Sequence, residues 1–205
     1  LSLIGHFLSA INGVAIARRS SWALDLLGKQ VFPTGTVLRE DPTRARVSGS
    51  RPFDAEGLAT QPRNIVEDGI LTGWTLDLAT ARKLEMTPTG NAARSTSGGP
   101  SPTVWNVALS QGDKSRDEMI AEMGTGLVVT SMIGSTINPN TGDYSRGAAG
   151  FWVENGEIAY PVSGVTIAGN LIDMLRTITP ANDARPWLSR VVPSLRVEGL
   201  TLAGE

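Results

Sequence analysis

The amino-acid sequence predicts an α+β protein, a β-rich domain of antiparallel sheets and hairpins with an N-terminal helix and a few short helices. Apolar residues recur at three- and four-residue spacing near the N-terminus, the pattern of an amphipathic helix. Further along, the spacing is mostly two residues, which is typical of strands. Asp-Gly and Asn-Gly pairs lie between apolar arms, as in tight hairpins. We therefore divide the chain into a helical segment, residues 1–32, that continues from a missing upstream domain, and a β-rich C-terminal domain, residues 33–205.

Composition limits the kinds of partner. The chain has 205 residues, 40% of them hydrophobic, enough to bury a core without disulfides. Its 18 Lys and Arg residues are scattered among 20 Asp and Glu residues, so we expect no nucleic-acid partner. The absence of cysteine excludes disulfides and thiolate sites and fits a cytoplasmic location. No apolar run approaches the roughly 20 residues of a membrane helix, so we expect no membrane partner.

The first elements are a helix and a strand. From Leu3 to about Leu27 the apolar residues form one helical stripe. Asn12-Gly13 lowers helix propensity, which predicts a kink or break there. Residues 33–57 predict one short strand and then a surface loop, because two prolines interrupt a polar stretch.

A hairpin and a short helix follow. Residues 63–77 hold Asp68-Gly69 between two apolar arms, and glycine easily takes the positive φ of a tight turn. Asp77 is a good N-cap for the next helix.

The central part of the chain predicts a loop, a strand and another helix. The strand is expected to run through Val104, Trp105 and Val107. The helix begins after Ser115, with Glu118 at the capping-box position, and ends at the next glycine. Its inward side chains are expected to be Met119, Ile120 and Met123.

A glycine-rich stretch, "NPNTGDYSRGAAGFWVENGEIAYPVSGVTIAGN" (138–170), has two explanations, a ligand-cradling loop or the turns of a β-rich scaffold. Asn155-Gly156 between two strand-like arms is a strong hairpin signal. The phosphate-loop pattern occurs nowhere, and Gly124 and Gly126 lack a third glycine. The sequence therefore favours the scaffold.

The end of the chain predicts one helix and one strand. The helix is expected within "GVTIAGNLIDMLRTI", because four apolar side chains fall on one helical face. They are Ile167, Leu171, Leu175 and Ile178. The tail, residues 193–205, alternates well enough for a last strand.

Four long blocks of the sequence are "DGILTGWTLDLATARKLEMTPTGNAAR", "EMGTGLVVTSMIGSTINPNTGDYSRGAAGFWVENGEIAYPV", "VTIAGNLIDMLRTI" and "PSLRVEGLTLAGE". In their order and spacing they resemble the TldD/PmbA family, and its PmbA (TldE) branch closely. The resemblance implies the C-terminal portion of a chain from a cytoplasmic two-subunit metalloprotease that acts on peptides and small proteins. An older label for the family is modulator of DNA gyrase. The resemblance also implies that zinc is held by an H-E-x-x-x-H helix in the TldD-like partner, and that no cofactor is held in this chain.

The first six residues, "LSLIGH", correspond to that metal-binding motif. Leu1 stands where the resemblance expects the first histidine, Ser2 where it expects the glutamate general base, and His6 matches the second histidine. A catalytic zinc site normally needs three protein ligands and an open water position. The further cysteine ligand of the zinc-bearing branch has no counterpart, because the chain has no cysteine. We therefore expect neither metal ligands nor catalytic residues in this chain, and its status as an enzyme stays open.

Other catalytic groups find little support. A lone histidine such as His6 in an apolar helix is more often a packed residue than a ligand. No serine stands in a G-x-S-x-G motif with a base at hand. Glu154 and Glu157 flank a turn, where exposed charge is the ordinary expectation.

Tyr144 and Arg146 are the predicted binding residues, for a peptide or a partner subunit. They lie on a glycine-flanked segment, and both residue types are enriched at binding hot spots. Equally, Arg146 could pair with Asp143 and fix the loop. Four tryptophans are expected as core or interface anchors: Trp74, Trp105, Trp152 and Trp187. An open strand edge could bind an extended peptide, but the sequence does not identify that edge.

Two functions follow as hypotheses. In the first, the chain is the non-catalytic, metal-lacking subunit of a TldD/TldE-type zinc metalloprotease that acts on peptides and small unfolded proteins. Its partner would be a TldD-like zinc-bearing chain. In the alternative, it is a stand-alone homodimeric binding or scaffold protein with no proteolytic role. A self-sufficient hydrolase would require a site that the sequence does not contain.

Overall fold

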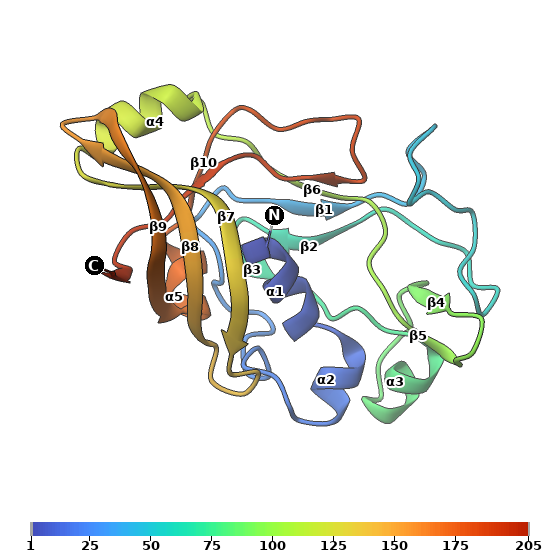
Figure 1. The fold of residues 1–205 in the computed structure, drawn as a ribbon. Helices are drawn as coiled ribbons and strands as arrows, with labels where there is room; N and C mark the ends of the chain where they lie inside the picture. The colour runs from blue at the N-terminus through green and yellow to red at the C-terminus, as the bar shows by residue number, and fades with distance from the viewer. Residues whose placement is uncertain (1, 205) are drawn as a thin grey trace. The chain divides into compact units, whose positions relative to one another are not determined.

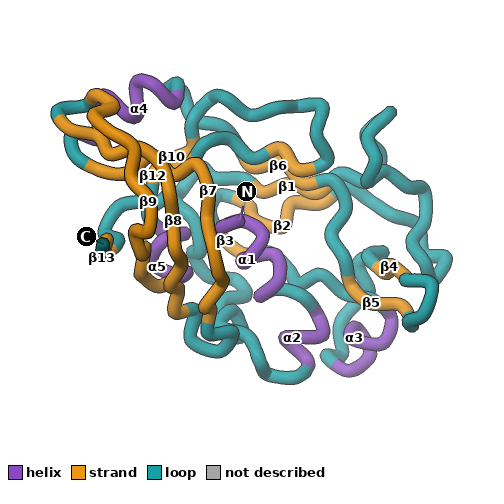
Figure 2. The backbone as a smooth tube through the Cα atoms, viewed as in Figure 1, coloured by secondary structure: helices purple, strands orange, loops and turns teal. Residues whose placement is uncertain are grey.

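The computed structural model describes residues 2–204 and has the predicted α+β architecture, with short helices and mostly antiparallel sheets (Figures 1 and 2). The chain forms two compact units. Unit 1 comprises the chain up to Ser110 together with Arg185–Val192, and unit 2 comprises Gln111–Ala184 and Pro193–Glu205. The predicted boundary after residue 32, and the upstream domain, stay predictions.

Unit 1 begins with two helices, α1 (Ser2–Ala10) and α2 (Gly13–Ala17). The predicted break is confirmed: the side chain of Asn12 caps α2 by accepting a 2.9 Å hydrogen bond from Val14 N. The prediction of a helix to about Leu27 was wrong. Ser21 Oγ donates to Ala10 O and accepts from Ala23 N, which folds this segment back on α1 in turns.

A five-stranded sheet forms the centre of unit 1, in the order β11-β6-β1-β2-β3. Its strands are β1 (Leu38–Glu40), β2 (Arg63–Glu67), β3 (Ile70–Leu71), β6 (Val107–Leu109) and β11 (Arg190–Val191). All pairs are antiparallel except β11 with β6. The predicted hairpin joins β2 to β3, and Asp68 and Gly69 both have positive φ, 50° and 77°.

The remaining elements of unit 1 are a helix and a two-stranded ribbon. Helix α3 (Leu78–Lys83) is capped by Asp77, as predicted, in a capping box with Thr80. The ribbon pairs β4 (Ala92–Arg94) with β5 (Pro100–Pro102). An aromatic group supports α1, where the ring of Phe7 meets Phe32 edge-on at 5.0 Å between centroids.

A buried ion pair links the strands of unit 1 to its loops. Glu40 on β1 is 1% exposed, and its Oε2 accepts a 2.7 Å hydrogen bond from Arg63 Nε on β2. The guanidinium also donates to Trp74 O at 2.8 Å and to Thr75 Oγ1 at 3.0 Å. Every arm of this guanidinium therefore has an acceptor.

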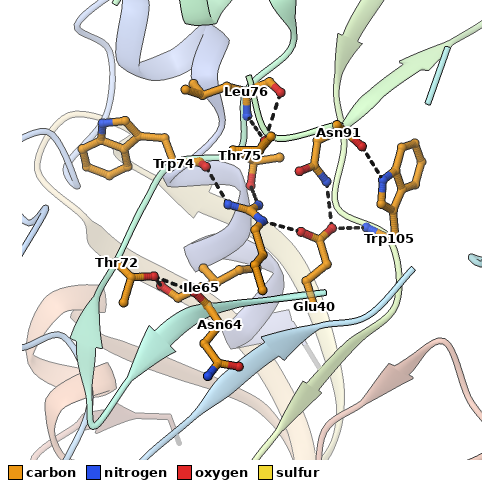
Figure 3. A network of polar contacts seen from close by, with 12 residues as sticks. Glu40, Asn64, Ile65, Thr72, Trp74, Thr75, Leu76, Asn91 and Trp105 are labelled. Carbon is orange, nitrogen blue, oxygen red and sulfur yellow. Dashed lines mark hydrogen bonds and ion pairs between the residues drawn. The ribbon is translucent and has the colours of Figure 1, made fainter. Parts of the chain in front are cut away.

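The second oxygen of Glu40 accepts hydrogen bonds from two further segments, which contain Asn91 and Trp105 (Figure 3). Oε1 accepts from Asn91 Nδ2 at 2.8 Å and from Trp105 N at 2.6 Å. The indole of Trp105 donates to Gly90 O at 2.9 Å. The strand predicted through Val104 and Trp105 begins later, at Val107. The reason is that Trp105 N donates its hydrogen bond to the side chain of Glu40 and not to a neighbouring strand.

Unit 2 is built on a four-stranded antiparallel sheet in the order β13-β9-β8-β7. Its strands are β7 (Gly126–Ile137), β8 (Asp143–Glu154), β9 (Glu157–Asn170) and β13 (Thr201–Ala203). The predicted hairpin joins β8 to β9, with Asn155 and Gly156 at φ of 52° and 79°. Most of the glycine-rich stretch is thus sheet, and a side chain at Gly150 would collide with the backbone of Val128.

Two helices and a short ribbon complete unit 2. Helix α4 (Arg116–Met123) has the predicted capping box between Ser115 and Glu118. Of its expected inward side chains, Met119 is buried, whereas Ile120 and Met123 are half-buried. The ribbon pairs β10 (Thr179–Pro180) with β12 (Leu195–Arg196), so the tail forms two short strands rather than one.

The last helix, α5 (Leu171–Arg176), is shorter than predicted. All four predicted apolar side chains are buried, but Ile167 lies in β9 and Ile178 follows the helix. The reason is the sheet: β9 pairs with β8 as far as Asn170, whose side chain then caps α5 by accepting from Ile172 N.

We predict that Glu40→Ala destabilises the protein by about 3–5 kcal/mol, because it leaves the guanidinium of Arg63 buried without its carboxylate. Urea denaturation followed by far-UV circular dichroism measures the loss. The matched control is Arg39→Ala on the same strand, where the side chain is exposed; it should change stability by less than about 0.5 kcal/mol. Equal effects of the two substitutions would contradict a central role for Glu40.

Candidate functional site

The segment that matches the metal-binding motif lies on α1, from Ser2 to His6; Leu1 lies outside the described residues. Ser2 is exposed, and His6 is half-buried among Leu3, Ile4 and Phe7 of the same helix, which are buried. This placement is consistent with a packed histidine. The helix presents the imidazole of His6 and the hydroxyl of Ser2. A metal site with a general base would need a carboxylate at the position of Ser2 and a second imidazole.

The surroundings of α1 do not supply the missing ligands. Among residues 2–204, no three His, Cys, Asp or Glu side chains come together as a metal site. A Cβ added to Gly5 would lie 3.9 Å from Nη1 of Arg190, so a guanidinium lies close to this turn of the helix. The donor groups present therefore do not fit a zinc ion.

Tyr144 and Arg146 lie two residues apart on β8, so they share one face of the sheet. Tyr144 is 4% exposed, and its hydroxyl lies 3.5 Å from the sulfur of Met132 on β7. Arg146 is half-buried, and its Nε donates a 2.7 Å hydrogen bond to Gly134 O. The structure thus brings the predicted pair together on the sheet rather than in a loop.

Asp143 has partners other than Arg146. Its carboxylate accepts from the hydroxyl of Thr141 at 2.6 Å and from the amide of Asn170 at 3.1 Å. These two hydrogen bonds lower the pKa of Asp143, and the bond from Thr141 has the larger effect. The local role of Arg146 is instead to satisfy a carbonyl at a bulge, because the register of β7 shifts between Ile133 and Thr136.

Burial raises the pKa of Tyr144 above its ordinary value of 10.0. The positive charge of Arg146 and a hydrogen bond between the two side chains act in the opposite direction, because both stabilise the phenolate. A phenol with a raised pKa in the folded protein stabilises the fold below pH 10, and this contribution is lost as the pH rises through the folded pKa.

The other candidate residues divide between core and surface. Glu154 and Glu157 are exposed, as predicted. Trp74 and Trp105 are buried in unit 1, whereas Trp187 is 71% exposed. The outer strands of the unit 2 sheet are β7 and β13, which identifies the edges that the sequence left open. Within residues 2–204, no helix has the length and apolarity required to cross a membrane.

We predict that Arg146→Ala raises the pKa of Tyr144 further, because the phenolate loses its cation and its hydrogen bond. The chain has two tyrosines, so in a Tyr160→Phe background the ultraviolet absorbance of the phenolate reports Tyr144 alone. Arg176→Ala, an exposed arginine on α5, serves as the control. A midpoint that falls or stays unchanged in Arg146→Ala would contradict the pairing of the two side chains.

Comparison with known proteins gives consistent matches along the whole chain. Residues 1–204 match the family described as "PmbA/TldA metallopeptidase C-terminal domain". The "Metalloprotease PmbA" of Escherichia coli O157:H7 is 47% identical over 204 residues, which are 99% of this chain and 43% of the relative. The chain thus spans less than half the length of that relative.

Two solved structures share the fold. A Bacteroides thetaiotaomicron protein described as a modulator of DNA gyrase superposes with a TM-score of 0.89 at 33% identity, over 100% of this chain and 44% of that one. TldE from Thermococcus kodakarensis superposes with a TM-score of 0.83 over 96% of this chain and 46% of that one, and at 24% identity it supports the fold alone. The chain therefore belongs to the PmbA/TldA metallopeptidase C-terminal domain family.

Proposed function

We propose that this chain is the non-catalytic, metal-lacking subunit of a zinc metalloprotease complex that acts on peptides and small unfolded proteins. The observation that carries the proposal is the composition of α1, where Ser2 and His6 stand in the motif that would supply a base and two imidazoles. Family membership supplies the protease context, since a relative at 47% identity is named a metalloprotease. From the resemblance alone, we place the complex in the cytoplasm.

The zinc would belong to a TldD-like partner chain in this proposal. One imidazole and a serine hydroxyl cannot replace three ligands and a general base, so no catalytic step is assigned to this chain. Its contribution would be to bind and orient substrate or partner. The outer edge of β7 suits an extended peptide, because the strand is twelve residues long and paired only with β8.

The alternative function, a stand-alone homodimeric binding or scaffold protein, also has an observation in its favour. Six large apolar side chains of the unit 2 sheet are exposed: Val129, Ile133, Phe151, Ile158, Tyr160 and Leu202. A second copy of the chain that covered some of these side chains would remove apolar surface from water, which favours association. Sedimentation velocity on the chain alone and with the TldD-like protein of the same genome separates a homodimer from a mixed complex.

We predict that cleavage of an unstructured peptide requires both chains, and that zinc measured by elemental analysis follows the TldD-like chain. Changing the glutamate of the partner's motif to glutamine should abolish cleavage, whereas His6→Ala in this chain should leave it unchanged. Stoichiometric zinc in this chain that is lost with His6→Ala would show a catalytic centre of its own. A folded mixture that cleaves nothing would favour the scaffold alternative.

We predict that Arg146→Ala weakens association with the partner chain more than it lowers the thermal stability of this chain. The reason is that its guanidinium is half-buried on the sheet, and arginine is enriched at interface hot spots. Isothermal titration calorimetry and thermal denaturation give the two quantities, and Arg176→Ala is the exposed control. A large loss of stability with unchanged association would restrict Arg146 to its bond with Gly134.

A further inference from the structure

Two segments far apart in the sequence carry an excess of arginine. Residues 42–51 and 185–190 contain five arginines and no Asp or Glu, in a chain with 20 acidic and 18 basic residues. The arginines are Arg44, Arg46, Arg51, Arg185 and Arg190. Both segments belong to unit 1. Basic residues that lie far apart in the sequence therefore belong to one unit of the fold.

Arg44 binds the two segments together. Its Nη1 donates to Leu188 O at 3.0 Å, and its Nη2 donates to Pro186 O. The backbone of Arg44 is held in turn, because its carbonyl accepts from Ser50 Oγ. One guanidinium thus fixes the carbonyls on either side of Trp187.

The loop that carries Trp187 has further supports. Leu188 N donates to Arg185 O at 3.2 Å, which closes a turn, and Val107 N on β6 donates to Ser189 O at 2.9 Å. Despite these supports Trp187 is 71% exposed and Leu188 is 40% exposed, whereas Trp22, Trp74 and Trp105 are buried. The fold therefore holds one large aromatic ring outward on an ordered loop, and pre-organisation of this kind lowers the entropy lost on binding.

Among the acidic groups nearest along the chain, Asp41 offsets part of the charge of Arg44, because the two charges interact. Asp41 accepts from the backbone and the hydroxyl of Thr43, at 2.9 and 2.7 Å. The hydroxyl bond is the largest effect that lowers its pKa, and Arg39 and Arg44 lower it further. Asp183 accepts from Ser194, and Glu40 is buried on Arg63.

Three of the arginines are exposed, and Nη1 of one of them, Arg190, lies near Gly5 of α1. The other two are Arg46 and Arg185. Arg51 is used internally, because its guanidinium lies 3.7 Å from the ring centroid of Trp105. We name the surface made by Arg44, Arg46, Arg185, Trp187, Leu188 and Arg190 the Arg–Trp patch. It combines two exposed apolar side chains with net positive charge.

We propose that the Arg–Trp patch binds an acidic peptide segment that carries a large apolar side chain for Trp187. Carboxylates of the peptide would pair with the exposed guanidinium groups, for which arginine has the matching two-pronged geometry. The proposal goes beyond the protease role, since it concerns binding by this chain alone and holds whether or not a partner subunit exists.

The composition of the patch favours a protein ligand over a nucleic acid. All five basic residues of the two segments are arginine and none is lysine, and protein interfaces are enriched in arginine and depleted of lysine. A single-stranded nucleic acid is usually held by several stacking aromatic rings, and here there is one.

The test is fluorescence anisotropy with a labelled ten-residue glutamate-rich peptide that carries a central Leu-Phe pair. Trp187→Ala and the double variant Arg46→Ala/Arg185→Ala should each weaken binding at least about tenfold, and added salt should weaken it in the parent chain. Phe53→Ala, which removes an exposed aromatic ring of unit 1 outside the patch, and Arg82→Ala on α3 are the matched controls and should bind as the parent does. Circular dichroism confirms that each variant is folded.

Three results would overturn the proposal. The first is parental affinity in Trp187→Ala, because the apolar contact would then be irrelevant. The second is equally tight binding of a lysine-rich peptide of the same length, because the surface would then not select acidic groups. A single-stranded oligonucleotide that binds more tightly than the acidic peptide, and loses affinity in the same variants, would assign the patch to nucleic acid.

Discussion

Unit 1 depends on the ion pair between Glu40 and Arg63. A carboxylate that is almost fully enclosed is stable only if its oxygens are bonded, and here both oxygens have partners from different segments. The pair therefore connects β1 and β2 with the loops that carry Asn91 and Trp105. Trp105 in turn supports Arg51, so the arrangement of the long loop after β1 also rests on this carboxylate.

The parts of the fold that sequence reasoning predicted are those set by local chemistry. Asp68–Gly69 and Asn155–Gly156 require positive φ at both turn positions, which few other pairs allow, so their hairpins were placed correctly. The errors lie where distant contacts decide. The helix expected to reach Leu27 ends early because Ser21 bonds to α1, and the helix expected before Asn170 is a strand because β8 pairs with it.

The two candidate sites also differ in how far the sequence alone could predict them. The expectation for the motif segment on α1 could be formed from consecutive residues, since spacing along one helix is a local property. The Arg–Trp patch could not, because residues 42–51 and 185–190 are joined by hydrogen bonds of Arg44 to backbone carbonyls more than 140 positions away. The sequence of neither segment predicts those hydrogen bonds. A surface assembled from distant segments therefore has to be sought in the fold and not in a sequence motif.

The segment Arg185–Val192 belongs to unit 1, although the chain on both sides of it belongs to unit 2. The polypeptide therefore passes between the units three times, and neither unit is a continuous stretch of sequence. A fragment that ends at Ser110 would lack β11 and would leave Arg44 without the carbonyls of Pro186 and Leu188. Completion of unit 1 during synthesis must then wait until residues 185–192 have been made, after most of unit 2.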